Sequence, residues 1–130
     1  MLDRIDIHIE VPAVKYKEMA GEATGESSES VRVRVEKARA VQRQRFAGQN
    51  GTVCNARMTP KQIKEHCRLD EESQELLKMA MTELNLSARA YDRILKVSRT
   101  IADLDHAERV QSHHVSEAIQ YRSLDRQLWV

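Results

Sequence analysis

The first stretch of the chain alternates between apolar and polar residues with a period of two. The apolar positions are Ile5, Ile7, Ile9 and Val11, and acidic or imidazole side chains stand between them. This period is typical of a strand with one buried face, and Pro12 ends it. We therefore predict a strand over residues 5–11. Because no later segment has the pattern of a partner strand, we expect residues 1–12 to be the last strand of a truncated core.

A polar segment follows this strand. Residues 21–30 contain one alanine and otherwise only glycine, serine, threonine and glutamate. Such a composition cannot bury enough surface to fold and is typical of a solvated linker. We place the linker at residues 13–29 and expect residues 30–130 to form the folded domain.

The start of that domain fits two patterns. Residues 31–35 alternate valine and arginine like a strand, but their valines also fit the spacing of a helix. Residues 36–45 consist almost wholly of strong helix formers. The neighbours therefore favour one helix from Ser30 to Phe46, which ends before Gly48.

Later helices begin at N-cap residues. Thr59 is followed by Pro60 and then Gln62, which combines an N-cap, a proline in the first turn and a capping box. Asp70 and Ser87 are N-caps of the same kind. We expect helices from Thr59 to about Arg68, from Asp70 to about Leu84, from Ser87 to about Asp103 and over residues 112–123.

The helix after Ser87 has the clearest apolar face. Leu86 and Tyr91 have the spacing of a hydrophobic staple at its start. We expect the following side chains to face inward: Tyr91, Ile94, Leu95, Ser98, Ile101 and Ala102. The predicted fold class is thus mainly α, a bundle of about five helices preceded by one unpaired strand and a linker. An apolar tail, Leu128-Trp129-Val130, follows the last helix.

The composition excludes several classes of protein. Among 130 residues, 21 Lys+Arg and 20 Asp+Glu leave a formal net charge of +1, so no overall field favours nucleic acid or an anionic membrane. No apolar run approaches the roughly 20 residues that cross a bilayer. No secretory signal and no phosphate-binding loop of the G-x-x-x-x-G-K-[ST] type are present. We expect a cytoplasmic chain of one domain that does not hydrolyse nucleotides on its own.

Arg89 is the residue that most clearly breaks a local rule. It falls at the second position of a helix, where the helix dipole disfavours a cation, and Arg93 adds a like charge one turn later. A bound anion would relieve both penalties, because a helix N-terminus with an arginine is a natural phosphate site. The alternative is that Arg89 and Arg93 are solvated and partly offset by Asp92.

Other charged and sulfur-containing residues carry weaker signals. Arg4 precedes the predicted strand and could reach a partner, although a surface ion pair with Asp3 or Asp6 is the more common role. Cys54 and Cys67 lack metal-binding spacing, so we assign them to packing. Neighbouring histidines on a helix point in different directions, so we assign no metal site to His113 and His114 either.

The helix from Ser30 to Phe46 is strongly basic. Its cations surround the helix and aromatic residues are nearly absent, so nucleic-acid binding is not indicated by this pattern alone. The segment from Asp70 to Leu84 carries five acidic residues, Asp70 included, and pairing between these two helices is the alternative. The basic residues are Arg32, Arg34, Lys37, Arg39, Arg43 and Arg45.

Three segments carry a resemblance to a known family. They are Leu-Asp-Arg-Ile-Asp-Ile-His-Ile-Glu-Val-Pro at residues 2–12, Leu-Ser-Ala-Arg-Ala-Tyr-Asp-Arg-Ile-Leu at 86–95 and Ser-Arg-Thr-Ile-Ala-Asp-Leu at 98–104. On the basis of these three segments, the chain resembles the C-terminal part of the magnesium-chelatase-like AAA+ ATPases, the family of YifB and competence protein ComM. The resemblance runs from Leu2 to Arg122. It implies a helical lid domain attached to an upstream ATPase core.

The resemblance also implies roles for individual arginines. Arg4 occupies the position of the arginine finger, which acts on ATP of a neighbouring subunit, and Arg89 that of the sensor 2 residue, with Arg93 as a further candidate phosphate ligand. The implied whole protein is a hexameric ring that uses ATP and Mg²⁺ and remodels a substrate, with DNA as the candidate. The nucleotide-binding elements are missing, so we expect an excised fragment that binds neither cofactor. The alternatives are a free-standing helical DNA- or protein-binding module, or the lid of a true magnesium-chelatase subunit.

Overall fold

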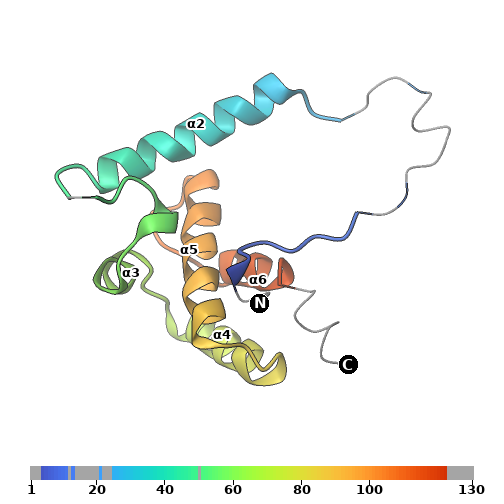
Figure 1. Cartoon of the computed structure of the whole chain (residues 1–130), viewed down its shortest axis with the longest axis vertical. Coiled ribbons are helices and arrows are strands. Elements are labelled where there is room, and N and C mark those ends of the chain that lie inside the picture. Colours follow the sequence, from blue (N-terminus) through green and yellow to red (C-terminus); the bar gives the residue numbers. More distant parts are fainter. Residues whose placement is uncertain (1–3, 12, 14–20, 22–24, 50, 123–130) are drawn as a thin grey trace.

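The computed structural model describes residues 4–11, 13, 21, 25–49 and 51–122. This part of the chain forms α-helices and a short 3₁₀ helix, η2, and contains no strand. Figure 1 shows α5 as the central column, with α2 across the end where α5 finishes and α4 across the end where it begins. The elements are α2 (Ser28–Arg45), η2 (Asn55–Arg57), α3 (Pro60–His66), α4 (Glu71–Glu83), α5 (Ala88–Leu104) and α6 (Ser112–Gln120).

The prediction of a mainly helical bundle is confirmed. The helices α2, α3, α4 and α5 each begin at a residue whose side chain caps the helix. The Thr59 side chain accepts from the Gln62 N–H and completes a capping box. Asp70 and Ser87 accept from the N–H groups three residues later. Ser27 does the same for α2, so this helix begins at Ser28, two residues earlier than expected. These caps satisfy N–H groups that a helix end otherwise leaves unpaired.

The core lies where α3, α4 and α6 meet α5. Phe46, at the end of α2, and Met58, after η2, reach into it from the other side. Gly48 and Gly51 have φ of +80° and +79°, values that glycine adopts readily, and they allow the turn from α2 to η2. The buried core side chains are Phe46, Met58, Ile63, Cys67, Leu77, Ile94, Leu95, Ala102, Val110, Val115 and Ala118.

The predicted strand over residues 5–11 is wrong for the described part of the chain. These residues form an irregular segment beside α6 (Figure 1). The exposure is also the reverse of that expected, because Ile9 is 63% exposed and Val11 75%, whereas His8 is 4% exposed. An alternating segment forms a strand only when a neighbour supplies its hydrogen bonds, and no neighbour is present among the described residues.

Smaller corrections concern side chains and helix ends. Tyr91 is 40% exposed rather than inward-facing. The helices α3 and α6 end at His66 and Gln120, a few residues earlier than predicted. The tail Leu128-Trp129-Val130 lies outside the described residues. Among the helices that are described, none combines the length and the apolar character that crossing a bilayer requires.

Candidate functional site

Arg89 lies at the exposed start of α5. Ser87 caps this helix by accepting from the Ala90 N–H at 3.2 Å, and the first turn contains no acidic residue. Arg89 is solvent-exposed and makes no hydrogen bond or ion pair within the described part of the chain. Its positive charge therefore adds to the partial positive charge of the helix N-terminus without a counter-ion.

Arg93, one turn later, has a partner that the sequence did not predict. Its Nη1 pairs with a carboxylate oxygen of Asp6, from the irregular N-terminal segment. Both side chains are partly exposed, 32% for Arg93 and 47% for Asp6. The structure thus brings Arg93 to the segment that carries Arg4, while Arg89 remains separate.

The N-terminal segment is attached to α5 and α6 at several points besides this ion pair. Arg122 donates from Nη1 to the carbonyl oxygen of Ile5, and the His8 N–H donates to the carbonyl oxygen of Tyr121. Arg4 precedes these contacts, is exposed and has no partner among the residues described. The fold therefore fixes the backbone next to Arg4 and leaves its side chain accessible.

A buried polar network holds α2 against α5. The Asp103 carboxylate is fully buried and accepts two hydrogen bonds from Arg45, at 2.6 and 2.9 Å. Asn55 donates to the same carboxylate at 2.8 Å, and Arg99 approaches it at 3.1 Å. Burial by itself would raise the pKa of Asp103, but the hydrogen bonds from Arg45 and Asn55 and the nearby cationic charges outweigh it, so this pKa is lowered.

This network is not evident from the sequence pattern. Arg99 and Asp103 have the i,i+4 spacing of an ion pair, and Ser98 and Ala102 beside them lie on the predicted inward face. An oppositely charged pair, Arg99 and Asp103, on the inward face of a helix is the sequence feature that indicates a buried ion pair. Its third member, Arg45, was counted among the basic residues of α2.

The two neighbouring histidines of α6 lie closer together than expected. Their ring centroids are 4.0 Å apart, and both Nε2 atoms approach Asp105, from 3.4 Å for His113 and 2.9 Å for His114. The expectation that their side chains diverge is therefore wrong. His114 Nδ1 accepts the Gln111 N–H at 3.0 Å, so Nε2 carries the proton and donates to Asp105. In this tautomer His114 Nε2 has no lone pair for a metal ion. The His114 side chain instead caps the start of α6 through the Gln111 N–H.

The cysteines have no sign of catalytic activation. Cys67 is buried in the core, and burial raises its pKa to about 11. A thiol with so high a pKa is protonated at neutral pH and is a poor nucleophile. Cys54 is half-buried, and both cysteines are free thiols.

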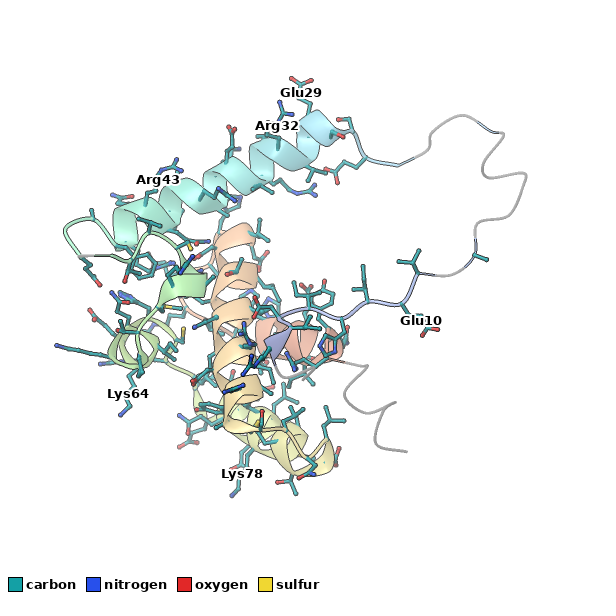
Figure 2. All side chains as sticks on the ribbon, viewed as in Figure 1. Glu10, Glu29, Arg32, Arg43, Lys64 and Lys78 are labelled. Atoms are coloured by element: carbon teal, nitrogen blue, oxygen red, sulfur yellow. The ribbon has the colours of Figure 1, made fainter. Side chains whose placement is uncertain are left out.

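The cations of α2 are divided between two environments. Arg45 belongs to the buried network, and Arg34 pairs with Glu26. Figure 2 shows Arg32 and Arg43 on the outer side of α2, away from the rest of the molecule. The acidic helix α4 lies at the opposite end of α5 (Figure 1), so the expected pairing between these two helices is not what holds α2 in place.

The chain matches known proteins over most of its length. Residues 25–122 match the family model described as magnesium chelatase, subunit ChlI C-terminal. The chain is 41% identical over 128 residues to competence protein ComM of Haemophilus influenzae, and 38% identical to the uncharacterized protein YifB of Escherichia coli. Each match covers 98% of this chain and 24% of the relative, so the chain spans about a quarter of the length of these proteins. The chain therefore belongs to the family of the magnesium chelatase ChlI C-terminal region, in the form that it takes in ComM and YifB.

Proposed function

We propose that this chain is the lid of a ring-forming AAA+ ATPase and supplies arginines that contact ATP phosphates. In this role Arg89 binds ATP as sensor 2, and Arg4 reaches the ATP of a neighbouring subunit. ATP hydrolysis in the ring then drives the remodelling of a substrate. Family membership supports the lid assignment, and the state of the two arginines supports their roles.

The unpaired Arg89 at the start of α5 is the observation that carries the proposal. An arginine at the positive end of a helix, exposed and without a counter-ion, is unfavourable in the chain alone. A phosphate group would remove the conflict, because the guanidinium offers a planar set of donors that matches phosphate oxygens. The residues present therefore fit a nucleotide phosphate at this end of α5.

The contacts around Arg4 support a role between subunits. The backbone beside it is held by Arg122, and Asp6 is held by Arg93. A finger of this kind stabilises negative charge on the transferred phosphate, which requires a fixed base and a free tip. Arg93, a further candidate for a phosphate contact, would have to leave Asp6 to make one.

ATP and Mg²⁺ belong to the whole ATPase in this proposal. ATP supplies the phosphoryl group that is transferred to water, and Mg²⁺ neutralises its charge. Arg4 and Arg89 would position and stabilise that phosphate. The chain carries no residues assigned to Mg²⁺ binding, so we expect no hydrolysis by the chain alone.

A chimera tests the proposal. In it, this chain replaces the matching quarter of Haemophilus influenzae ComM, and ATP turnover is measured. We expect Arg4→Ala to lower turnover by about a thousandfold, and Arg4→Lys to restore little of it. Arg57→Ala, a change of an exposed arginine in η2, is the matched control and should leave turnover unchanged. Normal turnover of the Arg4→Ala chimera would overturn the finger assignment.

We further propose DNA as the remodelled substrate, since α2 presents exposed cations. Arg32, Arg39 and Arg43 follow one side of this helix at spacings of seven and four residues. The same side supports a second candidate, a module that binds DNA or protein on its own. Anisotropy of labelled duplex DNA at increasing salt separates the two candidates. Tight binding by the chain alone with a steep salt slope favours the module, and weak binding that strengthens in the chimera favours the lid.

A further inference from the structure

An ion pair joins the two parts of the chain that carry the arginines assigned to ATP. Arg4 lies on the N-terminal segment, and Arg89 lies on α5. Between these two parts, Arg93 Nη1 of α5 contacts a carboxylate oxygen of Asp6. Its two members are 87 positions apart in the sequence, so the pair exists only because the fold brings the segment to α5.

Each member of the pair lies close to one of the assigned arginines. Arg93 follows Arg89 by four residues, so both leave α5 on the same side. Asp6 is two residues after Arg4. Alternate residues of an extended chain point to the same side, so Arg4 and Asp6 would share a face in the strand that this segment is expected to form beside an upstream core. The partner of Asp6 thus determines the direction in which that face points.

The other attachments of the segment do not fix this direction. Arg122 binds the carbonyl oxygen of Ile5, and the carbonyl oxygen of Tyr121 accepts the His8 N–H. Both contacts are made by backbone atoms of the segment, and both lead to the end of α6. Two attachments to one place leave rotation about the line that joins them. The contact of Asp6 with a different helix restricts that rotation.

The state of Arg93 favours this role over a contact with phosphate. Its charge already has a carboxylate partner, whereas Arg89 is exposed and has no partner in the described part of the chain. An arginine that must first give up a carboxylate gains less from a phosphate than an unpaired one does. Arg89 alone therefore fits the phosphate contact on α5.

We propose that Asp6 and Arg93 are positioning residues for Arg4, a role that rests on the proposed function. The pair holds the segment in the orientation in which Arg4 meets the ATP of the neighbouring subunit, and neither Asp6 nor Arg93 touches the phosphate. The two side chains are partly exposed, 47% for Asp6 and 32% for Arg93. A pair of this kind is weak, so its loss should cost about threefold to fivefold in turnover, far less than the loss of Arg4 itself.

The test uses the chimera with the ComM core and separates kcat from the KM for ATP. Asp6→Asn removes the charge and should lower kcat about threefold to fivefold without a change in KM, because a finger acts on the transition state. Asp6→Glu retains the carboxylate and should retain most of the turnover. Glu10→Gln is the matched control, since Glu10 is exposed on the same segment and points away from α5 (Figure 2). It should leave kcat and KM unchanged.

A double-mutant cycle shows whether the two residues act through one contact. Arg93→Gln should lower kcat as much as Asp6→Asn, and the double variant should lose no more than either single variant. The Tm of each variant is measured and should not change. The proposal is overturned if Asp6→Asn retains the full kcat, if the two losses multiply, or if Arg93→Gln raises the KM for ATP.

Arg4→Ala in the same chimera separates a failure of this proposal from a failure of the proposed function. A large loss for Arg4→Ala together with a normal kcat for Asp6→Asn overturns the positioning role and leaves the finger assignment intact. Normal turnover of the Arg4→Ala chimera overturns the finger assignment, and the positioning role fails with it.

Discussion

The buried carboxylate of Asp103 allows a quantitative test of how the fold is held together. It is the shared acceptor for Arg45 and Asn55 and lies beside Arg99. The Asp103 side chain is fully buried, and Arg45 and Arg99 are 14% and 4% exposed. Asp103→Ala would leave two arginines without their common counter-charge. Removing one partner of a buried ion pair typically costs about 3–5 kcal/mol.

Arg45→Ala should be less harmful, because Asp103 would keep its contacts with Arg99 and Asn55. We therefore expect a smaller loss of stability for Arg45→Ala than for Asp103→Ala. The double variant should lose less than the sum of the two single variants, with a coupling of roughly 1–3 kcal/mol. The assay is urea unfolding followed by circular dichroism, with the slope of the transition checked for each variant.

For a chain of this size, the loss predicted for Asp103→Ala corresponds to a fall in Tm of roughly 10–20 °C. The control is Glu26→Ala, which breaks the ion pair with Arg34 at the exposed start of α2. This change should leave the transition where it is, since surface ion pairs contribute little. The reasoning is refuted if Arg45→Ala destabilises the chain as much as Asp103→Ala, or if the two changes are additive.

Three further predictions concern pH, a helix cap and the N-terminal segment. Asp103 and Asp105 both have lowered pKa values in the folded chain, Asp105 through hydrogen bonds from His114 and His113. Their contribution to stability is thus present above the ordinary aspartate pKa of 3.8 and is lost as the pH falls through the lower folded values, so the urea midpoint should fall steeply below pH 4. A smaller decline should already begin below pH 6.5, because burial lowers the pKa of His66 and the unfolded chain then binds a proton that the folded chain does not. Thr59→Ala removes the cap of α3 and should cost about 1 kcal/mol in the same assay, whereas Thr59→Ser should cost less. Asp6→Ala breaks a partly exposed pair, so hydrogen exchange should accelerate for residues 5–8 while the urea midpoint stays unchanged, and a shifted midpoint would contradict this.

Local chemistry made much of the fold predictable. The caps at Thr59, Asp70 and Ser87 act within three residues, and each helix begins where its cap was recognised. The segment over residues 5–11 behaves differently, because a strand depends on a neighbour that its own sequence does not specify. Without that neighbour, His8 became the buried residue in place of the isoleucines.

The candidate site was predictable in part for the same reason. The position of Arg89 at the start of a helix follows from its local sequence, and its conflict with the helix dipole is local as well, whereas its role toward a phosphate stays a prediction. The contact of Arg93 with Asp6 joins residues 87 positions apart, and that of Arg45 with Asp103 joins residues 58 positions apart. Such pairs depend on how helices pack. From the sequence, their members could be identified only as charged residues.

The central claim is that Arg89 serves a phosphate rather than the fold, and one paired measurement tests it. Arg89→Ala is introduced into the isolated chain and into the chimera with the ComM core, and the Tm of the chain is compared with ATP turnover by the chimera. We expect an unchanged or slightly higher Tm, because the substitution removes an unpaired cation from a helix N-terminus, together with a large loss of turnover per folded molecule. If the Tm falls by several degrees while turnover per folded molecule remains normal, Arg89 is a structural residue and the sensor assignment fails.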